Sequence, residues 1–138
     1  MKNILFTLLF LASSLFAQIE WLDSYDEALK RSRELDRPIL LLMVSDSCGW
    51  CRKLKEKTLQ NPEVENYINR RYVPLMLNRE RDEYPSFIKA KYVPTTFYID
   101  PDGKLLIDPV VGYWEADEYM SDLRLVLRVF KRRKSLHR

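Results

Sequence analysis

The sequence predicts an α/β fold in which a central mixed β-sheet carries helices on both of its faces. Short apolar segments alternate along the chain with longer segments of helical periodicity. Strands separated by helices pair in parallel through crossover connections, so this alternation indicates parallel pairs. The turn sequence Pro101-Asp102-Gly103 joins two further strand candidates and adds one antiparallel pair. A chain of 138 residues suffices for one domain with its own hydrophobic core.

The first half of the chain carries the signals of two strands and several helices. The continuous apolar run 39–44 is short and follows a helical segment, which favours a strand buried on both faces. Asn61 and Pro62 are typical of the cap and first residue of a helix, whereas Pro74 argues against a regular central strand. We expect a helix over residues 23–35, strands over 39–44 and 72–77, a helix that begins at the cysteines, and a helix over 62–70.

The second half of the chain predicts a strand, its hairpin partner and a long terminal helix. The run from Pro94 to Ile99 is β-branched and aromatic, which favours a strand. Gly112 breaks the chain before a segment whose apolar residues fall on one helical face. We expect a loop over residues 78–83, a short helix over 85–91, strands over 94–99 and 104–107, and a helix over 115–130.

The N-terminal segment differs in composition from the rest of the chain. Lys2 precedes the almost wholly apolar stretch Ile4–Phe16, and the small residue Ala17 comes before a polar segment. This order is typical of a secretory signal peptide, and 13 apolar residues fall short of the roughly 20 that a membrane-spanning helix needs. We therefore expect a signal peptide over residues 1–17, a domain over 18–138 and a periplasmic location. A buried N-terminal helix is the alternative.

The charge balance argues against nucleic acid as a partner. The chain carries 23 Lys and Arg against 20 Asp and Glu, a formal charge of +3, which is too even for a nucleic-acid-binding surface. Much of the excess lies in the run Lys131–Lys134, within a basic tail over residues 131–138. A solvated helix end explains this tail, because cations are favourable at helix C-termini. Contact with anionic lipid is the alternative.

Cys48 and Cys51 are the two cysteines of the chain, and they lie in one tetrapeptide at a predicted strand-to-helix junction. The helix start favours a thiolate on Cys48, the species that attacks a disulfide. Cys51 lies one turn further on, where it can resolve the mixed disulfide. A zinc site would need further ligands, and the one histidine, His137, lies near the chain end. A purely structural disulfide is the alternative, although so small a loop gains little chain-entropy stabilisation.

Several motifs occur together in an order that is more specific than the cysteine pair alone: Trp21, Arg37-Pro38, Ser47-Cys48-Gly49-Trp50-Cys51-Arg52-Lys53-Leu54, Tyr92-Val93-Pro94-Thr95-Thr96-Phe97, Asp102-Gly103-Lys104 and Gly112-Tyr113. With these motifs, residues 20–127 resemble the thioredoxin family, and more closely its secreted thioredoxin-related branch. The resemblance implies a thioredoxin-like fold and a cis peptide bond before Pro94, which would face the cysteines. It also implies a partner chain that pairs with the backbone of Val93 as an added strand.

The chain departs from thioredoxin itself at three places near the cysteines. Leu42 occupies the position of a buried acid that assists the resolving thiol, Ser47 replaces a tryptophan, and the pair between the cysteines is Gly-Trp. These departures leave exchange chemistry intact but argue against a general reductase role. Asp46 and Glu56 are both candidates to replace the missing acid.

The expected function is that of a periplasmic thiol–disulfide oxidoreductase that exchanges disulfides with protein thiols, acting as a reductant. Cys48 and Cys51 are the expected catalytic pair, and Trp50, Val93 and Pro94 are expected to bind the substrate. The cysteines carry the electrons, so no organic cofactor or metal is expected. We expect a monomer that a membrane partner recharges or oxidises. Two alternatives stay open: a thioredoxin-like module that binds a peptide or Cu(I) without turnover, and a redox-inert interaction domain.

Overall fold

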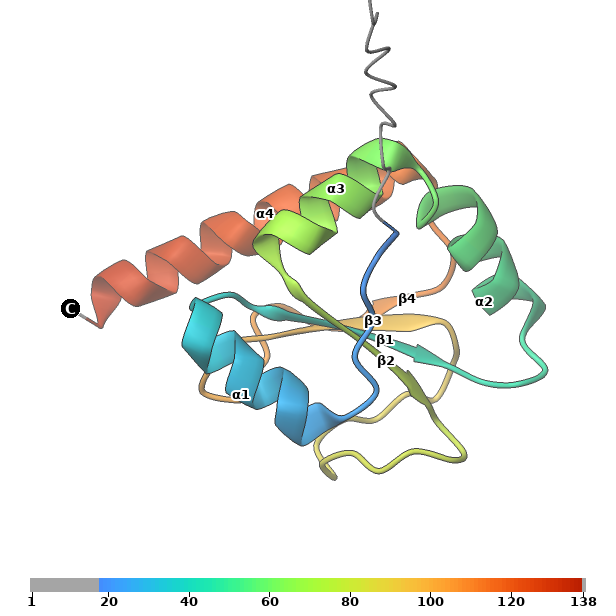
Figure 1. The fold of residues 1–138 in the computed structure, drawn as a ribbon, viewed down its shortest axis with the longest axis horizontal. Coiled ribbons are helices and arrows are strands. Elements are labelled where there is room, and N and C mark those ends of the chain that lie inside the picture. Colours follow the sequence, from blue (N-terminus) through green and yellow to red (C-terminus); the bar gives the residue numbers. More distant parts are fainter. Residues whose placement is uncertain (1–17, 138) are drawn as a thin grey trace, which may run out of the picture.

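A mixed sheet of four strands in the order β2-β1-β3-β4 forms the centre of the computed structural model, which describes residues 18–137 (Figure 1). The strands are β1 (Ile39–Val44), β2 (Val73–Asn78), β3 (Thr95–Ile99) and β4 (Val110–Val111). β1 pairs in parallel with β2 and antiparallel with β3, and β4 pairs antiparallel with β3. The predicted mixed sheet is therefore confirmed.

Helices cover both faces of this sheet. They are α1 (Tyr25–Leu35), α2 (Gly49–Lys53), which continues as the π-helix η1 (Leu54–Thr58), α3 (Pro62–Arg71) and α4 (Ala116–Leu136). Figure 1 shows α1 on the opposite side of the sheet from α3 and α4. Alternate residues of β1 serve the two cores: Leu40 and Leu42 pack with α2, α3 and α4, whereas Leu41 and Met43 pack with α1.

Local signals in the sequence explain where the helices begin and end. The Ser24 side chain accepts a hydrogen bond from the Glu27 N–H at the start of α1, and the Asn61 side chain caps α3 in the same way. Asp36 ends α1 in the left-handed conformation, with φ at 51°. Each of these caps satisfies backbone groups that have no partner within the helix.

Pro74 is accommodated because it lies in β2, an edge strand of the sheet. Its carbonyl accepts a hydrogen bond from the Leu22 N–H on the side of β2 that faces away from β1. The nitrogen of the same residue points to that side too, so the missing N–H removes no bond to β1. The predicted strand is thus confirmed. Pro74 is compatible with it because its nitrogen faces away from β1.

One predicted element is wrong, and another is formed only in part. Residues 85–91 form turns rather than a helix: the Ile88 N–H bonds to the Pro85 carbonyl, and the Ile88 side chain plugs the core on the α1 face. Residues 104–107 do pair with the end of β3 as an antiparallel hairpin, through the bridge between Ile99 and Leu105 and the hydrogen bond from the Leu106 N–H to the Tyr98 carbonyl, but they form no regular strand. The regular antiparallel partner of β3 is instead β4, which follows Pro109.

The two ends of the chain bear on the remaining predictions. The final helix is confirmed and extends to Leu136, beyond its expected end, so the basic tail is largely helical. The predicted signal peptide over residues 1–17 lies outside the described residues. Within residues 18–137, no helix is long and apolar enough to cross a membrane.

Three buried tyrosines lie between the sheet and α4 and differ in how their hydroxyls are satisfied. The Tyr72 hydroxyl donates to the Leu123 carbonyl at 2.6 Å, and the Tyr119 hydroxyl lies 3.2 Å from that of Thr96. The Tyr98 hydroxyl has no hydrogen-bond partner within the described part of the chain. Burial raises the pKa of all three phenols, so each is neutral across the working pH range.

Replacing these hydroxyls one at a time is expected to give opposite results. Tyr98→Phe removes a buried polar atom without a partner and should leave the free energy of unfolding unchanged or raise it by about 1 kcal/mol. Tyr72→Phe is the matched control and should lower it by about 1 kcal/mol, because a made hydrogen bond is lost. Denaturation with urea measures both, and a larger loss for Tyr98→Phe than for Tyr72→Phe would contradict the assignment.

Candidate active site at the Cys48–Cys51 disulfide

Cys48 and Cys51 form a disulfide at the start of α2, with their Cα atoms 5.2 Å apart. Cys48 is the cap residue of the helix, and Cys51 lies in its first turn. The Cys51 N–H points back at the first sulfur and donates to the Cys48 Sγ at 3.0 Å. The structure thus confirms the predicted position of both cysteines, and it places a backbone donor against the sulfur at the helix start.

The two sulfurs lie in different environments. Cys51 is 1% exposed and belongs to the apolar core beneath α2, which includes Leu42 and Leu54. Cys48 is only partly buried and packs against the edge of the same core. A reaction partner can therefore reach Cys48 and is kept away from Cys51.

The segment before β3 lies directly beside Cys48. The Val93 carbonyl oxygen is 3.6 Å from the Cys48 Sγ, and the Val93–Pro94 peptide bond is cis, as the resemblance implied. The pairing of Met43 with Thr95 explains this proximity, because antiparallel strands place the end of β1 next to the start of β3. Three of the residues expected to form the site, Cys48, Val93 and Pro94, are thus brought together by the sheet.

Trp50 projects into solvent from the first turn of α2, between the two cysteines, with 59% of its surface exposed. Its ring lies 5.9 Å from that of Tyr113, centre to centre, in a tilted arrangement. The Lys53 Nζ lies 5.0 Å from the centre of the Trp50 ring and 4.4 Å from that of Tyr113, within the range of cation–π attraction. We call Trp50, Lys53 and Tyr113 the aromatic platform.

Sequence reasoning identified one of the three platform residues. No site role follows from the sequence for Lys53 or Tyr113, yet both lie against the Trp50 ring. The spacing of Trp50 and Lys53, three residues apart on a helix, could have indicated their contact. No local pattern could have placed Tyr113, because its approach depends on pairing between β3 and β4.

Two hydrogen bonds hold the platform segment in place. The Gly112 N–H donates to the Pro94 carbonyl at 2.8 Å, with Gly112 at φ +97°, a conformation that favours glycine. The buried Thr58 hydroxyl donates to the Trp114 carbonyl and ties η1 to the same segment. Tyr113 lies between these two anchors, so its backbone is held by Pro94 on one side and by η1 on the other.

Asp46 and Glu56, the two acids considered as replacements for the missing carboxylate, lie in surroundings that do not involve Cys51. Asp46 accepts a hydrogen bond from the Asn78 amide at 3.1 Å and pairs with Arg81 at 3.1 Å, and Glu56 is exposed. Within residues 18–137, no hydrogen bond or ion pair joins either acid to Cys51. The same residues hold no group of three or more His, Cys, Asp or Glu that could bind a metal ion.

Comparisons with known proteins give one family model and several curated relatives. A family model described as a thioredoxin-like domain matches residues 25–126. Anterior gradient protein 3 of Mus musculus is 25% identical over 83 residues, 60% of this chain and 50% of that protein, so the alignment spans half its length. Disulfide bond reductase DsbH of Chlamydia pneumoniae is 28% identical over 126 residues, 82% of this chain and 75% of that protein.

A solved structure of a DsbH oxidoreductase resembles this chain in three dimensions. Its TM-score is 0.68 at 24% sequence identity, and the match covers 81% of this chain and 86% of that chain. At this identity the likeness shows the fold, which is thioredoxin-like, as predicted from the sequence.

The difference in exposure between the sulfurs predicts a difference in reactivity after reduction. We expect iodoacetamide to alkylate Cys48 at least about tenfold faster than Cys51, because Cys48 is accessible and faces a backbone donor that favours its thiolate. Mass spectrometry after a brief, limiting exposure measures the two rates. Alkylation of the chain in urea is the control and should equalise them, whereas equal rates in the folded chain would contradict the prediction.

Proposed function

Because the chain belongs to the thioredoxin-like domain family, we propose that it is a thiol–disulfide oxidoreductase whose catalytic pair is Cys48 and Cys51. Family membership and the cysteine disulfide together support this activity. The observation that carries the proposal is the asymmetry of the pair: the Cys48 sulfur is accessible and accepts the Cys51 N–H, while Cys51 is buried one turn behind it. This arrangement suits an attacking and a resolving thiol.

In the reducing direction, the Cys48 thiolate attacks one sulfur of a substrate disulfide. The substrate S–S bond breaks, its second sulfur leaves as a thiolate and takes up a proton, and Cys48 is joined to the first sulfur. Cys51 then loses its proton and attacks the Cys48 sulfur, which releases the substrate as a thiol and closes the Cys48–Cys51 bond. Two electrons pass from the cysteine pair to the substrate, and the reverse sequence oxidises a substrate dithiol.

Val93, Pro94 and Trp50 are proposed to bind the substrate chain around the attacked sulfur. The proximity of the Val93 backbone to Cys48 supports an extended substrate segment that pairs with it. Trp50 offers an exposed apolar surface with the partly buried Tyr113 beside it, and Lys53 adds a positive charge. The aromatic platform would thus favour substrates with an apolar or acidic side chain near the cysteine.

The finer assignment is a periplasmic reductant of protein disulfides that draws electrons from a membrane partner. The similarity to a protein named disulfide bond reductase supports the direction, and the expected signal peptide over residues 1–17 supports the location. The equilibrium of the Cys48–Cys51 couple with glutathione tests the direction. A potential close to that of strong oxidants, near −120 mV, would exclude the reducing role.

Serine substitutions of the cysteines should separate their roles. Cys51→Ser removes the resolving sulfur, so Cys48 is expected to remain joined to substrate, and a mixed disulfide with oxidised insulin should accumulate. Cys48→Ser is the matched control and should form none. Non-reducing electrophoresis detects the adduct, and equal adduct yields from the two variants would overturn the assignment of roles.

Removing the Trp50 ring of the aromatic platform should lower kcat/KM for a protein substrate without unfolding the chain. Trp50→Ala is expected to reduce kcat/KM for a disulfide-bonded protein about three- to tenfold, because an exposed aromatic contact is lost. Phe87→Ala removes a similarly exposed ring that packs on Tyr25 of α1 instead, and should change kcat/KM less than about twofold. Similar losses in both variants would argue against a platform that contacts substrate.

A further inference from the structure

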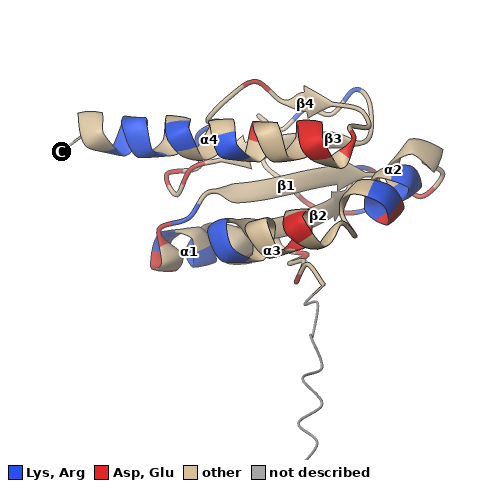
Figure 2. Ribbon diagram, turned by 90° about the horizontal axis from the view of Figure 1, so that it is seen from above, with Lys and Arg blue, Asp and Glu red and all other residues tan. Residues whose placement is uncertain are grey.

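The C-terminal two-thirds of α4 carries positive charge without any negative charge. From Leu123 to Leu136 the sequence contains six Lys and Arg and no Asp or Glu. Figure 2 shows acidic residues at the start of α4 and basic residues along the rest of it. This segment is therefore a strongly charged element on a chain whose overall balance is nearly even.

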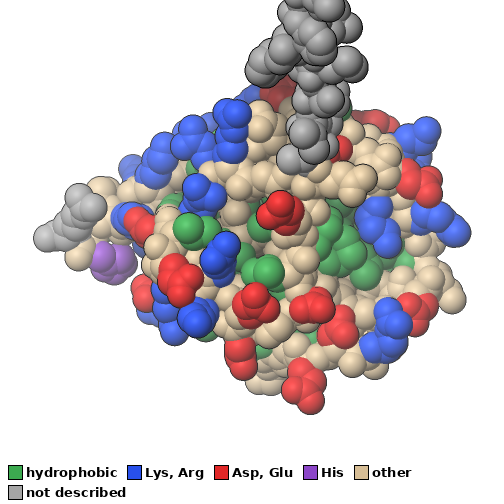
Figure 3. All heavy atoms as spheres, viewed as in Figure 1, with side chains coloured by type: hydrophobic (Ala, Val, Ile, Leu, Met, Phe, Trp, Pro, Cys, Tyr) green, Lys and Arg blue, Asp and Glu red, His purple; other side chains and the backbone are tan. Residues whose placement is uncertain are grey.

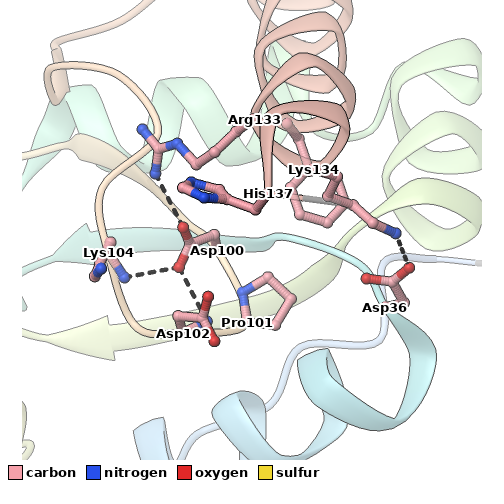
Figure 4. Close-up of a pocket in the computed structure, with 9 residues that line it drawn as sticks. Asp36, Asp100, Pro101, Asp102, Lys104, Arg133, Lys134 and His137 are labelled. Carbon is pink, nitrogen blue, oxygen red and sulfur yellow. Dashed lines mark hydrogen bonds and ion pairs between the residues drawn. The ribbon is translucent and has the colours of Figure 1, made fainter.

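Two of these six cations hold the helix end on the body of the protein. Arg133 pairs with the buried carboxylate of Asp100 at 2.9 Å, and Lys134 pairs with Asp36 at the end of α1 (Figure 4). Asp100 also accepts the backbone N–H groups of Asp102 and Lys104, so the turn after β3 is tied to α4 as well. These contacts fix which side of the helix faces outward.

The outward side presents the remaining cations together with exposed leucines. Arg128, Lys131 and Arg132 are exposed, and none of them has an ion pair within residues 18–137, whereas Arg124 pairs with Glu63 of α3. Leu125 and Leu136 are 42% and 77% exposed. The positions 125, 128, 132 and 136 recur at helical spacing, so the leucines and two of the arginines share one side of α4.

We propose that this side of α4, the basic face of Leu125, Arg128, Lys131, Arg132 and Leu136, docks onto a membrane surface of anionic phospholipids. In Figure 3 a row of Lys and Arg side chains stands out over the position of α4. Unpaired cations near an anionic surface each strengthen binding, and flanking apolar side chains can enter the headgroup region. The exposed leucines favour a lipid surface over a soluble polyanion, which offers them no apolar environment.

Docking through the basic face leaves the disulfide accessible. Figure 1 shows the free end of α4 and the start of α2, where the cysteines lie, at opposite ends of the molecule. A chain bound through α4 can therefore still present Cys48 to a substrate or partner at the membrane. The inference rests on charge and exposure alone, and it holds whether or not the proposed function does.

Vesicle sedimentation of the full chain tests the proposal. We expect binding to phosphatidylcholine vesicles that contain phosphatidylglycerol to exceed binding to pure phosphatidylcholine vesicles. We call this difference the anionic excess, and we expect it to fall as the salt concentration rises. Arg128→Glu/Lys131→Glu/Arg132→Glu should reduce this anionic excess at least tenfold, since each reversal removes one attraction of about fivefold and adds a repulsion. Any contribution of residues 1–17 is common to all variants, so the comparison between variants isolates the basic face.

A matched variant separates the basic face from net charge. Lys30→Glu/Lys57→Glu/Lys89→Glu makes the same change of charge at exposed positions outside α4 that have no ion pair among the described residues. It should keep at least half of the anionic excess. An equal loss in the two triple variants, or no loss in either, would overturn the proposal.

Two further readouts complete the test. Leu136→Gln should weaken anionic vesicle binding two- to fivefold without changing its salt dependence, because an exposed apolar contact is lost. Heparin in solution is the competing polyanion. If the chain bound heparin through the same three cations but showed no anionic excess on vesicles, the partner would be an acidic polymer and the membrane proposal would be wrong. Circular dichroism establishes that each variant is folded.

Discussion

The complete burial of β1 between its two neighbours fixes where the disulfide lies. Each of the six residues of β1 is buried, and both faces of the strand pack against helices. The strand ends at Val44, and its carbonyl accepts the Arg79 N–H from the segment after β2. Cys48 caps α2 four residues beyond Val44, so the first sulfur lies at the end of the sheet where β1 stops. The antiparallel pairing of β1 with β3 brings Val93 and Pro94 to this same end.

The sequence predicts those parts of the fold whose signals are local. The short apolar run 39–44 is typical of a strand buried on both faces, and the Asn61-Pro62 pair sets the start of α3 by capping chemistry. The helix predicted over 85–91 is wrong because tertiary contacts determine the conformation of that segment. The Ile88 side chain packs in the core beneath α1, and turns in the backbone place it there. The position of Tyr113 beside Trp50 is likewise a product of strand pairing, which one sequence does not reveal.

Environment, rather than sequence position alone, distinguishes the two sulfurs. Leu42, at the position where the resemblance to thioredoxin implies a buried acid, lies in the same apolar core as Cys51. A thiolate is disfavoured among apolar neighbours and favoured beside a donor at a helix start. The negative charge of the reduced pair is therefore drawn toward Cys48, which receives the Cys51 N–H. The two sulfurs therefore differ in both access and environment: Cys48 is partly exposed beside a backbone donor, and Cys51 is buried among apolar side chains.

The helix dipole accounts for only part of the charge on α4. Glu115 and Glu118 form a capping box at its start, and Arg133 and Lys134 lie in its last turn, as the dipole favours at each end. This effect fades within one turn of a helix end, so it does not reach Arg128, which lies two turns from Leu136. Internal ion pairs explain Arg133 and Lys134 but leave Arg128 without a described partner. Neither the helix dipole nor an internal ion pair therefore accounts for the exposed charge of Arg128. This charge is available for contact with a partner outside the protein.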